Sequence, residues 1–199
     1  MAVTTDMIRE LRDETGAGVL DCKRALEETG GDIAAATELL RRQGLAAAAK
    51  KTERVASDGR IEPYVHPGNR LAALVEVNCE TDFVARTEEF IALTHELAMQ
   101  VAAAKPRWVS RDDVPAEVLE AEKASYIEEM AGQNKPPQVM ERIIEGKLGK
   151  FYAENCLLEQ EYIRDSEQTI QDLITAAIAK LGENVVVRRF CRFQIGAED

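Results

Sequence analysis

The chain has 199 residues, of which 45% are hydrophobic, 31% charged and 5% aromatic, a composition typical of a globular protein with one sizeable core. Its net charge of -11 disfavours loose binding to nucleic acid or to anionic lipid. No apolar run approaches the roughly 18 residues of a membrane span, and residues 1–6 lack the features of a secretory signal. We therefore expect a cytoplasmic protein with neither a membrane nor a nucleic acid as its direct partner.

The first 54 residues predict a small domain of three short helices. Caps precede two of these helices and glycines follow all three. The first helix is expected from Thr4 or Thr5 to a break at residues 15–18, the second from Val19 to about Glu28, and the third from a cap at Asp32 to Gly44. The alanine-rich residues 46–57 then read as a helical or semi-rigid linker.

The second part, residues 55–199, opens with a β-hairpin. Residues 60–65 and 71–77 are rich in strand-forming residues, and Pro67, Gly68 and Asn69 lie between them. Pro63 cannot donate to a ladder of strand hydrogen bonds, so it should keep the first strand at an edge of the sheet.

A turn follows the second strand and carries the most informative residues of the chain. Either Thr81 or Asp82 is suited to cap a helix there, and Phe83 places a large apolar group beside a carboxylate. One interpretation is structural, with Asp82 as a cap and Phe83 as a core residue. The other is that a corner held by its neighbours presents both side chains to a partner. The pattern alone favours the structural interpretation.

The remaining sequence predicts four helices and a final strand. The helices begin near Thr87, at Pro115, after Pro136 and Pro137, and at Asp165 or Ser166, and the last one ends at Gly182. In the strand over residues 184–194, alternation places Val185, Val187, Arg189, Cys191 and Phe193 on one face. The expected fold class is α+β: a three-helix N-terminal domain followed by a core in which helices pack on a three-stranded antiparallel sheet.

Signatures of enzymes and of metal sites are missing from the sequence. The four cysteines and two histidines are scattered, without metal-site spacing, so we expect reduced thiols, no metal and no cofactor. Cys79 makes a poor nucleophile, because Glu80 and Asp82 should raise its pKa. The basic and aromatic residues 188–193 are compatible with an RNA-binding platform, but the net charge favours a strand with core aromatics and paired arginines.

Three segments resemble bacterial elongation factor Ts: residues 15–26 followed by Gly31 and Asp32, residues 75–85, and residues 182–190. The matches occur in order over nearly the whole chain. The resemblance implies a guanine nucleotide exchange factor, not an enzyme, that acts in protein biosynthesis on the GTPase elongation factor Tu. It also implies a UBA-like N-terminal domain and a core with a three-stranded antiparallel sheet.

The resemblance also implies roles for particular residues. Thr81, Asp82, Phe83 and Val84 match the motif that displaces Mg²⁺ at the nucleotide site of the GTPase. Contacts from the N-terminal domain to the same GTPase are expected from Arg12, Val19, Leu20 and Lys23, although many members of the family have two methionines where this chain has Val19 and Leu20.

The chain resembles a short form of the family. Longer members insert a second core half and a coiled-coil hairpin after the segment that matches residues 157–160. We therefore expect a homodimer and a 2:2 complex with the GTPase, joined through Val187, Arg189, Cys191 and Phe193. Cys191 can form a disulfide with Cys191 of the second copy if the Cα atoms approach within about 7 Å.

Two rival hypotheses for the function of the protein are a ubiquitin-associated adaptor and an RNA-binding ribosome accessory protein.

Overall fold

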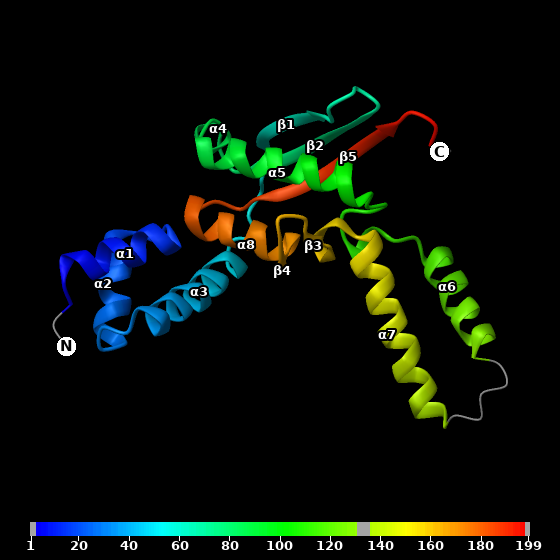
Figure 1. Ribbon diagram of the computed structural model, residues 1–199, viewed down its shortest axis with the longest axis horizontal. Helices are drawn as coiled ribbons and strands as arrows, with labels where there is room; N and C mark the ends of the chain where they lie inside the picture. Colours follow the sequence, from blue (N-terminus) through cyan, green and yellow to red (C-terminus); the bar gives the residue numbers. More distant parts are fainter. Residues whose placement is uncertain (1–2, 131–135, 198–199) are drawn as a thin grey trace. The chain divides into compact units, whose positions relative to one another are not determined.

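The computed structural model describes residues 3–130 and 136–197 (Figure 1). Its helices are α1 (Thr5–Thr15), α2 (Val19–Glu28), α3 (Ile33–Ala49), α4 (Asp82–Ala85), α5 (Glu88–Ala104), α6 (Ala116–Glu129), α7 (Pro137–Asn155) and α8 (Ile170–Leu181). Its strands are β1 (Asp58–Val65), β2 (Leu71–Cys79), β3 (Glu161–Tyr162), β4 (Asp165–Thr169) and β5 (Val186–Gln194). The expected α+β class is confirmed.

The chain forms two compact units that each combine distant segments. The first consists of residues 1–59, 78–93 and 174–186, and the second of residues 60–77, 94–173 and 187–199. The helical N-terminal segment thus shares a unit with the corner that carries Phe83 and with the C-terminal part of α8.

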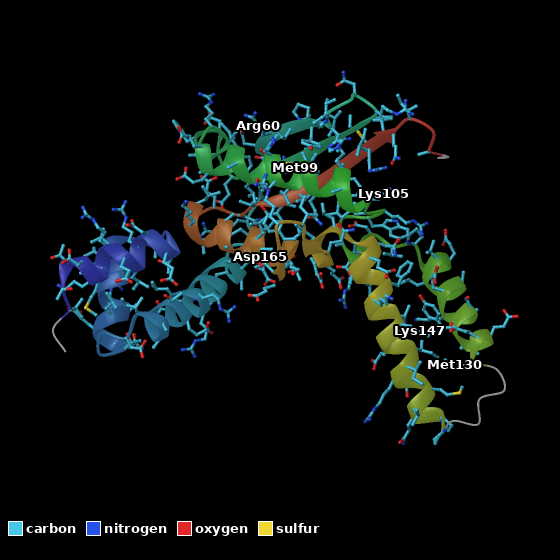
Figure 2. All side chains as sticks on the ribbon, in the orientation of Figure 1. Arg60, Met99, Lys105, Met130, Lys147 and Asp165 are labelled. Atoms are coloured by element: carbon cyan, nitrogen blue, oxygen red, sulfur yellow. The ribbon has the colours of Figure 1, made fainter. Side chains whose placement is uncertain are left out.

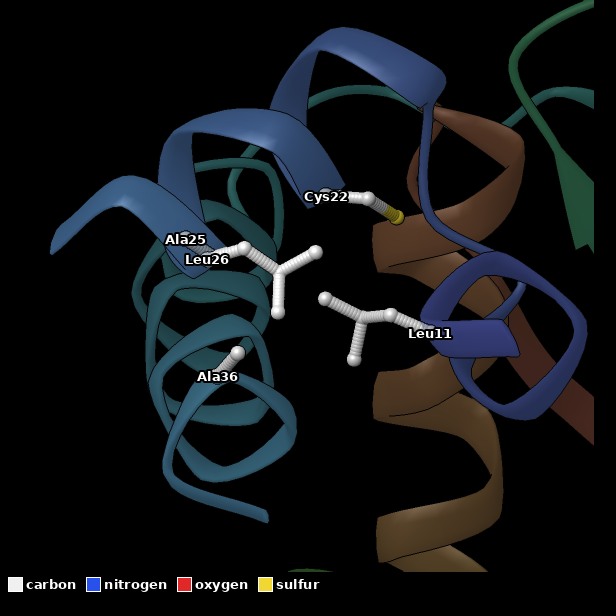
Figure 3. Close-up of a cluster of buried hydrophobic side chains, with 5 residues drawn as sticks. All are labelled: Leu11, Cys22, Ala25, Leu26 and Ala36. Atoms are coloured by element: carbon white, nitrogen blue, oxygen red, sulfur yellow. The ribbon is translucent and has the colours of Figure 1, made fainter. Parts of the chain in front are cut away.

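Helices α1, α2 and α3 enclose the small core that the sequence predicts. The Thr4 hydroxyl accepts a hydrogen bond from the Met7 amide at 3.3 Å and caps α1. Gly16 ends α1 with φ of 67°, a left-handed conformation that costs glycine little. The buried residues at the centre are small or of medium size: Leu11, Cys22, Ala25, Leu26 and Ala36 (Figure 3).

Helix α3 is longer than the sequence predicts. We expected it to end at Gly44, but it continues to Ala49. A Cβ atom at Gly44 would lie 3.2 Å from Cβ of Ala179 in α8. The glycine therefore permits a close approach of two helices within the first unit, at a cost of about 1 kcal/mol in helix propensity relative to alanine.

The main sheet has the strand order β1-β2-β5 and is antiparallel, as expected. Pro63 lies on the edge strand β1, where its missing amide leaves no partner unsatisfied. Gly68 and Asn69 adopt φ angles of 93° and 55° in the turn between β1 and β2. The hairpin prediction is confirmed.

Helix α5 covers the inner face of this sheet (Figure 1). Nδ1 of His95 lies 3.2 Å from a carboxylate oxygen of Glu62 in β1, and Nε of Arg192 in β5 donates to the Ala102 carbonyl at 3.0 Å. The alternating residues Ala73, Val75 and Val77 of β2 are at most 1% exposed. Because successive residues of a strand point to opposite faces, Leu74 and Glu76 of β2 lie on the outer face.

Helices α6 and α7 form an antiparallel hairpin (Figure 1). Lys147 of α7, labelled in Figure 2, pairs with Glu129 of α6, and its ammonium lies 5.1 Å from the centre of the Tyr126 ring. The sequence predicts both helices, one at Pro115 and one after Pro136 and Pro137, and the structure confirms them. This hairpin precedes residue 157, so it is not the insertion that the resemblance places after residue 160 in longer members of the family.

The start of the last helix was also predicted wrongly. Asp165 and Ser166 lie in β4, which pairs with β3 in a second, two-stranded sheet. Helix α8 starts at Ile170, where the Thr169 hydroxyl accepts from the Asp172 amide at 3.2 Å and the Asp172 carboxylate accepts from the Thr169 amide at 3.0 Å. Both positions offer good caps, so the local pattern does not distinguish the two helix starts.

Candidate partner-binding site

The corner after β2 is built around Thr81. The Thr81 side chain accepts a hydrogen bond from the Val84 amide at 3.4 Å, so Thr81 and not Asp82 caps the single turn of α4. Helix α4 places Ala85 inward, while Phe83 is 80% exposed. A large aromatic side chain left this exposed on an ordered corner is available to a partner. The interpretation of Phe83 as a core residue is therefore wrong.

Asp82 has a partner just beyond the end of its own helix. Its carboxylate lies 2.8 Å from Nη2 of Arg86, one turn further along the chain. Both side chains remain substantially exposed, at 45% for Asp82 and 77% for Arg86. An ion pair of this kind contributes little to stability and exchanges readily for a new partner.

A carboxylate from the opposite end of the sequence holds the backbone of the corner. Oε2 of Glu183 accepts hydrogen bonds from the Glu80 and Thr81 amides, both at 3.0 Å. Oε1 of Glu183 accepts from the Thr81 hydroxyl at 2.6 Å. Glu183 follows Gly182, which ends α8 with φ of 79°.

The contact is reciprocal. Oε1 of Glu80 accepts from the Asn184 amide at 2.7 Å. The Asn184 side chain, in a residue only 2% exposed, donates to the carbonyls of Thr52 and Arg54 at 3.3 and 2.8 Å. Arg54 in turn lies 3.5 Å from the Glu80 carboxylate. The linker after α3, the corner and the end of α8 therefore form one hydrogen-bonded cluster.

Cys79, the last residue of β2, is buried beneath this cluster. Burial raises the pKa of its thiol to about 11, and the negative charge of Glu183 adds to the rise. The expected direction is correct, but burial and Glu183 are the causes, where we had named Glu80 and Asp82. A thiol that stays protonated at neutral pH is a poor nucleophile.

The candidate contact residues of the N-terminal domain lie at its surface. Val19 and Leu20 begin α2 and are 52% and 70% exposed, while Cys22, Ala25 and Leu26 of the same helix face the core. Lys23 is exposed and lies 3.7 Å from Glu27, and Arg12 is exposed in the last turn of α1. All four side chains are therefore exposed to solvent.

The same unit contains both groups of candidate residues, and α8 contacts both neighbourhoods. Nζ of Lys51 donates to the Ile178 carbonyl at 3.5 Å, and Nζ of Lys180 lies 3.7 Å from the Glu89 carboxylate at the start of α5. Helix α8 thus contacts the linker after α3 and the first turn of α5.

Strand β5 has an exposed outer face over much of its length. Of the four predicted interface residues, Cys191 and Phe193 are exposed, the latter at 67%, and the Arg189 side chain is 78% exposed. Val187 is 6% exposed and packs within the chain. Nε of Arg189 donates to Glu76 at 2.6 Å, in line with the expectation of paired arginines, but Phe193 is not the core aromatic that we expected.

Glu183 and Asn184 are the site residues that sequence reasoning missed. Both lie in one of the segments that resemble the family, but nothing in the sequence assigns them a partner more than 100 residues away. Within residues 3–130 and 136–197, no cluster of three or more histidine, cysteine or acidic side chains is placed to hold a metal ion. No helix among these residues has the length and apolar character needed to cross a membrane.

Comparison with known proteins assigns the chain to a family. The family model described as elongation factor TS matches residues 34–197. The elongation factor Ts of Caldanaerobacter subterraneus is 56% identical over 194 residues, which cover 98% of this chain and 97% of the relative. That of Herpetosiphon aurantiacus is 54% identical over 99% of this chain and all of the relative, and that of Moorella thermoacetica is 55% identical over 95% and 93%. The chain is therefore a member of the elongation factor Ts family of translation factors.

Proposed function

We propose that this protein is the guanine nucleotide exchange factor for elongation factor Tu. It binds the GDP form of the GTPase in the cytoplasm, displaces Mg²⁺ and promotes release of GDP so that GTP can bind. Membership of the elongation factor Ts family supports this function. The observation that carries it is the exposed Phe83, held on a corner whose backbone is fixed by Glu183.

In this proposal, residues Thr81–Val84 enter the nucleotide domain of the GTPase near its Mg²⁺ and phosphate site. Phe83 fills an apolar space and Asp82 exchanges its ion pair with Arg86 for groups of the GTPase. Exchange proceeds through a ternary complex, in which exchange factor and nucleotide weaken each other's binding by the same factor. The protein needs no catalytic side chain and no cofactor for this task.

The energies indicate that Phe83 does not act alone. Accelerating GDP release by about a thousandfold requires a barrier lower by roughly 4 kcal/mol. Burial of a phenylalanine side chain contributes about 1.5–3 kcal/mol. The remainder must come from weakened Mg²⁺ coordination and from binding energy supplied by other contacts. We assign part of it to Arg12, Val19, Leu20 and Lys23 of a UBA-like N-terminal domain that comprises residues 1–54.

The core domain, residues 55–199, is proposed to form a homodimer through the outer face of the main sheet. Apolar residues on the three strands and just beyond them are exposed on this part of the chain: Ile61, Val65, Leu74, Phe193 and Ile195, at 42–67%. An exposed apolar face of this extent on a three-stranded sheet favours association. Arg189, Cys191 and Phe193 lie at the centre of the interface, Val187 supports it from within, and two protomers bind two GTPase molecules.

Release of fluorescently labelled GDP from elongation factor Tu tests the proposal. The protein at micromolar concentration should accelerate release strongly, and added Mg²⁺ should reduce the acceleration because it competes with Mg²⁺ displacement. A release rate equal to the spontaneous one, together with salt-dependent binding of ribosomal RNA, would favour the RNA-binding hypothesis instead.

A further inference from the structure

The Phe83 corner is too short to hold its own shape. Helix α4 has four residues and a single turn, and isolated helical turns are unstable in water because the first turn fixes several residues for one hydrogen bond. Phe83 is 80% exposed, so the packing of its own ring does little to fix its direction. Other groups must hold the backbone that carries it.

The carboxylate of Glu183 is placed to do this. It accepts from two consecutive amides, those of Glu80 and Thr81, and from the Thr81 hydroxyl, at 2.6–3.0 Å. Hydrogen bonds to an ionised acceptor are about twice as strong as bonds between neutral groups. All three donors precede Asp82 and Phe83 directly, so the carboxylate fixes the backbone from which Phe83 projects.

The Thr81 hydroxyl transmits this contact into the helix. It donates to Glu183 at 2.6 Å and accepts from the Val84 amide at 3.4 Å, the residue after Phe83. Thr81 and Val84, which precede and follow Phe83, are therefore linked through the Thr81 hydroxyl, which is itself bound to Glu183.

Asn184 holds the backbone on the C-terminal side of Glu183. Its amide binds the Glu80 carboxylate, and its buried side chain binds the carbonyls of the linker at Thr52 and Arg54. The backbone on either side of Glu183 is therefore anchored, at Gly182 by the end of α8 and at Asn184 by the linker.

We propose that Glu183 is a positioning residue for nucleotide exchange, which acts by fixing the direction of Phe83. This inference rests on the proposed function, because Phe83 must act on the GTPase for its direction to matter. A corner fixed before binding loses less conformational entropy when the partner engages it. Glu183 touches neither nucleotide nor Mg²⁺ in this account.

A double-mutant cycle on the full-length protein tests the inference. Glu183→Ala and Phe83→Ala are made singly and together, and the rate of labelled GDP release from elongation factor Tu is measured over a range of exchange factor concentrations. We expect Glu183→Ala to lower the maximal rate by about tenfold. Its half-saturating concentration should change by less than about threefold, because the N-terminal domain still binds. In the Phe83→Ala background, Glu183→Ala should change the rate by less than about twofold.

Two further variants separate positioning from loss of structure. Glu89→Ala removes the exposed ion pair with Lys180 in the same unit without touching residues 80–84, and should leave the exchange rate unchanged. Glu183→Gln keeps the size of the side chain and an oxygen that accepts from the two amides, so its rate should lie between those of the wild type and Glu183→Ala. It also replaces the alanine variant in the cycle if that variant does not fold.

Deuterium exchange of the amides of residues 78–86 gives a readout independent of activity. It should rise in Glu183→Ala and stay unchanged in Glu89→Ala. Equal losses of rate from Glu183→Ala in both Phe83 backgrounds, no loss in either, or a glutamine variant as slow as alanine would overturn the inference. Full exchange activity in Phe83→Ala alone would overturn the role of Phe83 and with it this inference, whereas a wild-type protein that does not accelerate GDP release would overturn the proposed function.

Discussion

The carboxylate of Asp82 pairs with the guanidinium of Arg86 at 2.8 Å, and it leaves the capping of helix α4 to Thr81. Asp82→Ala should therefore lower the free energy of unfolding by less than about 1 kcal/mol, as expected for an exposed ion pair. Its exchange rate should fall, although by less than that of Phe83→Ala, because the contact of Asp82 with the GTPase is lost. Urea denaturation and labelled GDP release measure the two effects.

Thr81→Ala is the matched control for Asp82→Ala. It removes both the cap and a hydrogen bond to Glu183, and should cost about 1–2 kcal/mol of stability. An Asp82 variant that is less stable than the Thr81 variant would contradict the assignment of the cap.

Much of the fold could be predicted from the sequence, because turns and caps are local signals. The glycine and asparagine of the β1–β2 turn, the prolines before α6 and α7, and Gly182 after α8 mark element boundaries by their backbone preferences. The end of α3 was not predictable. Gly44 is typical of a helix end, but α3 continues past it to Ala49, and the glycine instead permits the close approach of Ala179 in α8.

Some features of the candidate site could likewise be predicted from the sequence, and others could not. The position of the corner follows from neighbouring residues, as does the nearness of Phe83 to a carboxylate, but the sequence leaves the cap open between Thr81 and Asp82. The exposure of Phe83 and the contacts of Glu183 and Asn184 do not, because they depend on pairings between residues about 100 positions apart. Pairings at that distance depend on the tertiary fold, for which a single sequence carries no local signal.

Removal of the N-terminal domain should weaken binding to elongation factor Tu without preventing the rest of the chain from folding. A chain that begins at Lys51 keeps the linker carbonyls of Thr52 and Arg54 that bind Asn184, and it keeps the whole main sheet. We expect this truncated protein to unfold cooperatively but to bind elongation factor Tu much more weakly, because Arg12, Val19, Leu20 and Lys23 are lost. Calorimetric titration measures the affinity. An unchanged dissociation constant would show that the N-terminal domain serves another purpose.

The proposed dimer predicts the mass of the protein in solution. Sedimentation of the reduced protein at micromolar concentration should give twice the chain mass of 22.1 kDa. Phe193→Asp places a charge on the outer face of the sheet and should yield monomers. Ile127→Asp, at another exposed apolar position, on α6, should remain dimeric. A wild-type mass near 22.1 kDa would exclude the dimer.

The cysteines should differ sharply in reactivity. Cys79 and Cys156 are buried, and burial raises the pKa of each thiol to about 11, so both remain protonated at pH 8. Cys22 is buried in the N-terminal core, whereas Cys191 is exposed. A disulfide-exchange reagent should titrate one thiol rapidly in the native reduced protein at dilutions at which the dimer dissociates, and four after denaturation. The Cys191→Ser variant should lack the rapid phase.

The reactivity of Cys191 also tests the proposed dimer. If Cys191 lies near the two-fold axis, its reaction should slow as the protein concentration rises, and oxidation should join two chains. A dimer that persists in Cys191→Ser would show that the sheet face holds the chains together without a disulfide. Reaction at a rate independent of concentration would place Cys191 outside the interface.

The central claim is that an exposed Phe83 drives nucleotide release, and its most direct test is the rate of labelled GDP release from elongation factor Tu with Phe83→Ala at saturating concentration. We predict a loss of at least about tenfold, equivalent to about 1.4 kcal/mol of barrier, with a free energy of unfolding within about 0.5 kcal/mol of the wild type. Phe90→Ala, seven residues away and fully buried, should instead cost about 3–5 kcal/mol of stability. A wild-type rate for Phe83→Ala, or a loss of stability as large as that of Phe90→Ala, would contradict the account.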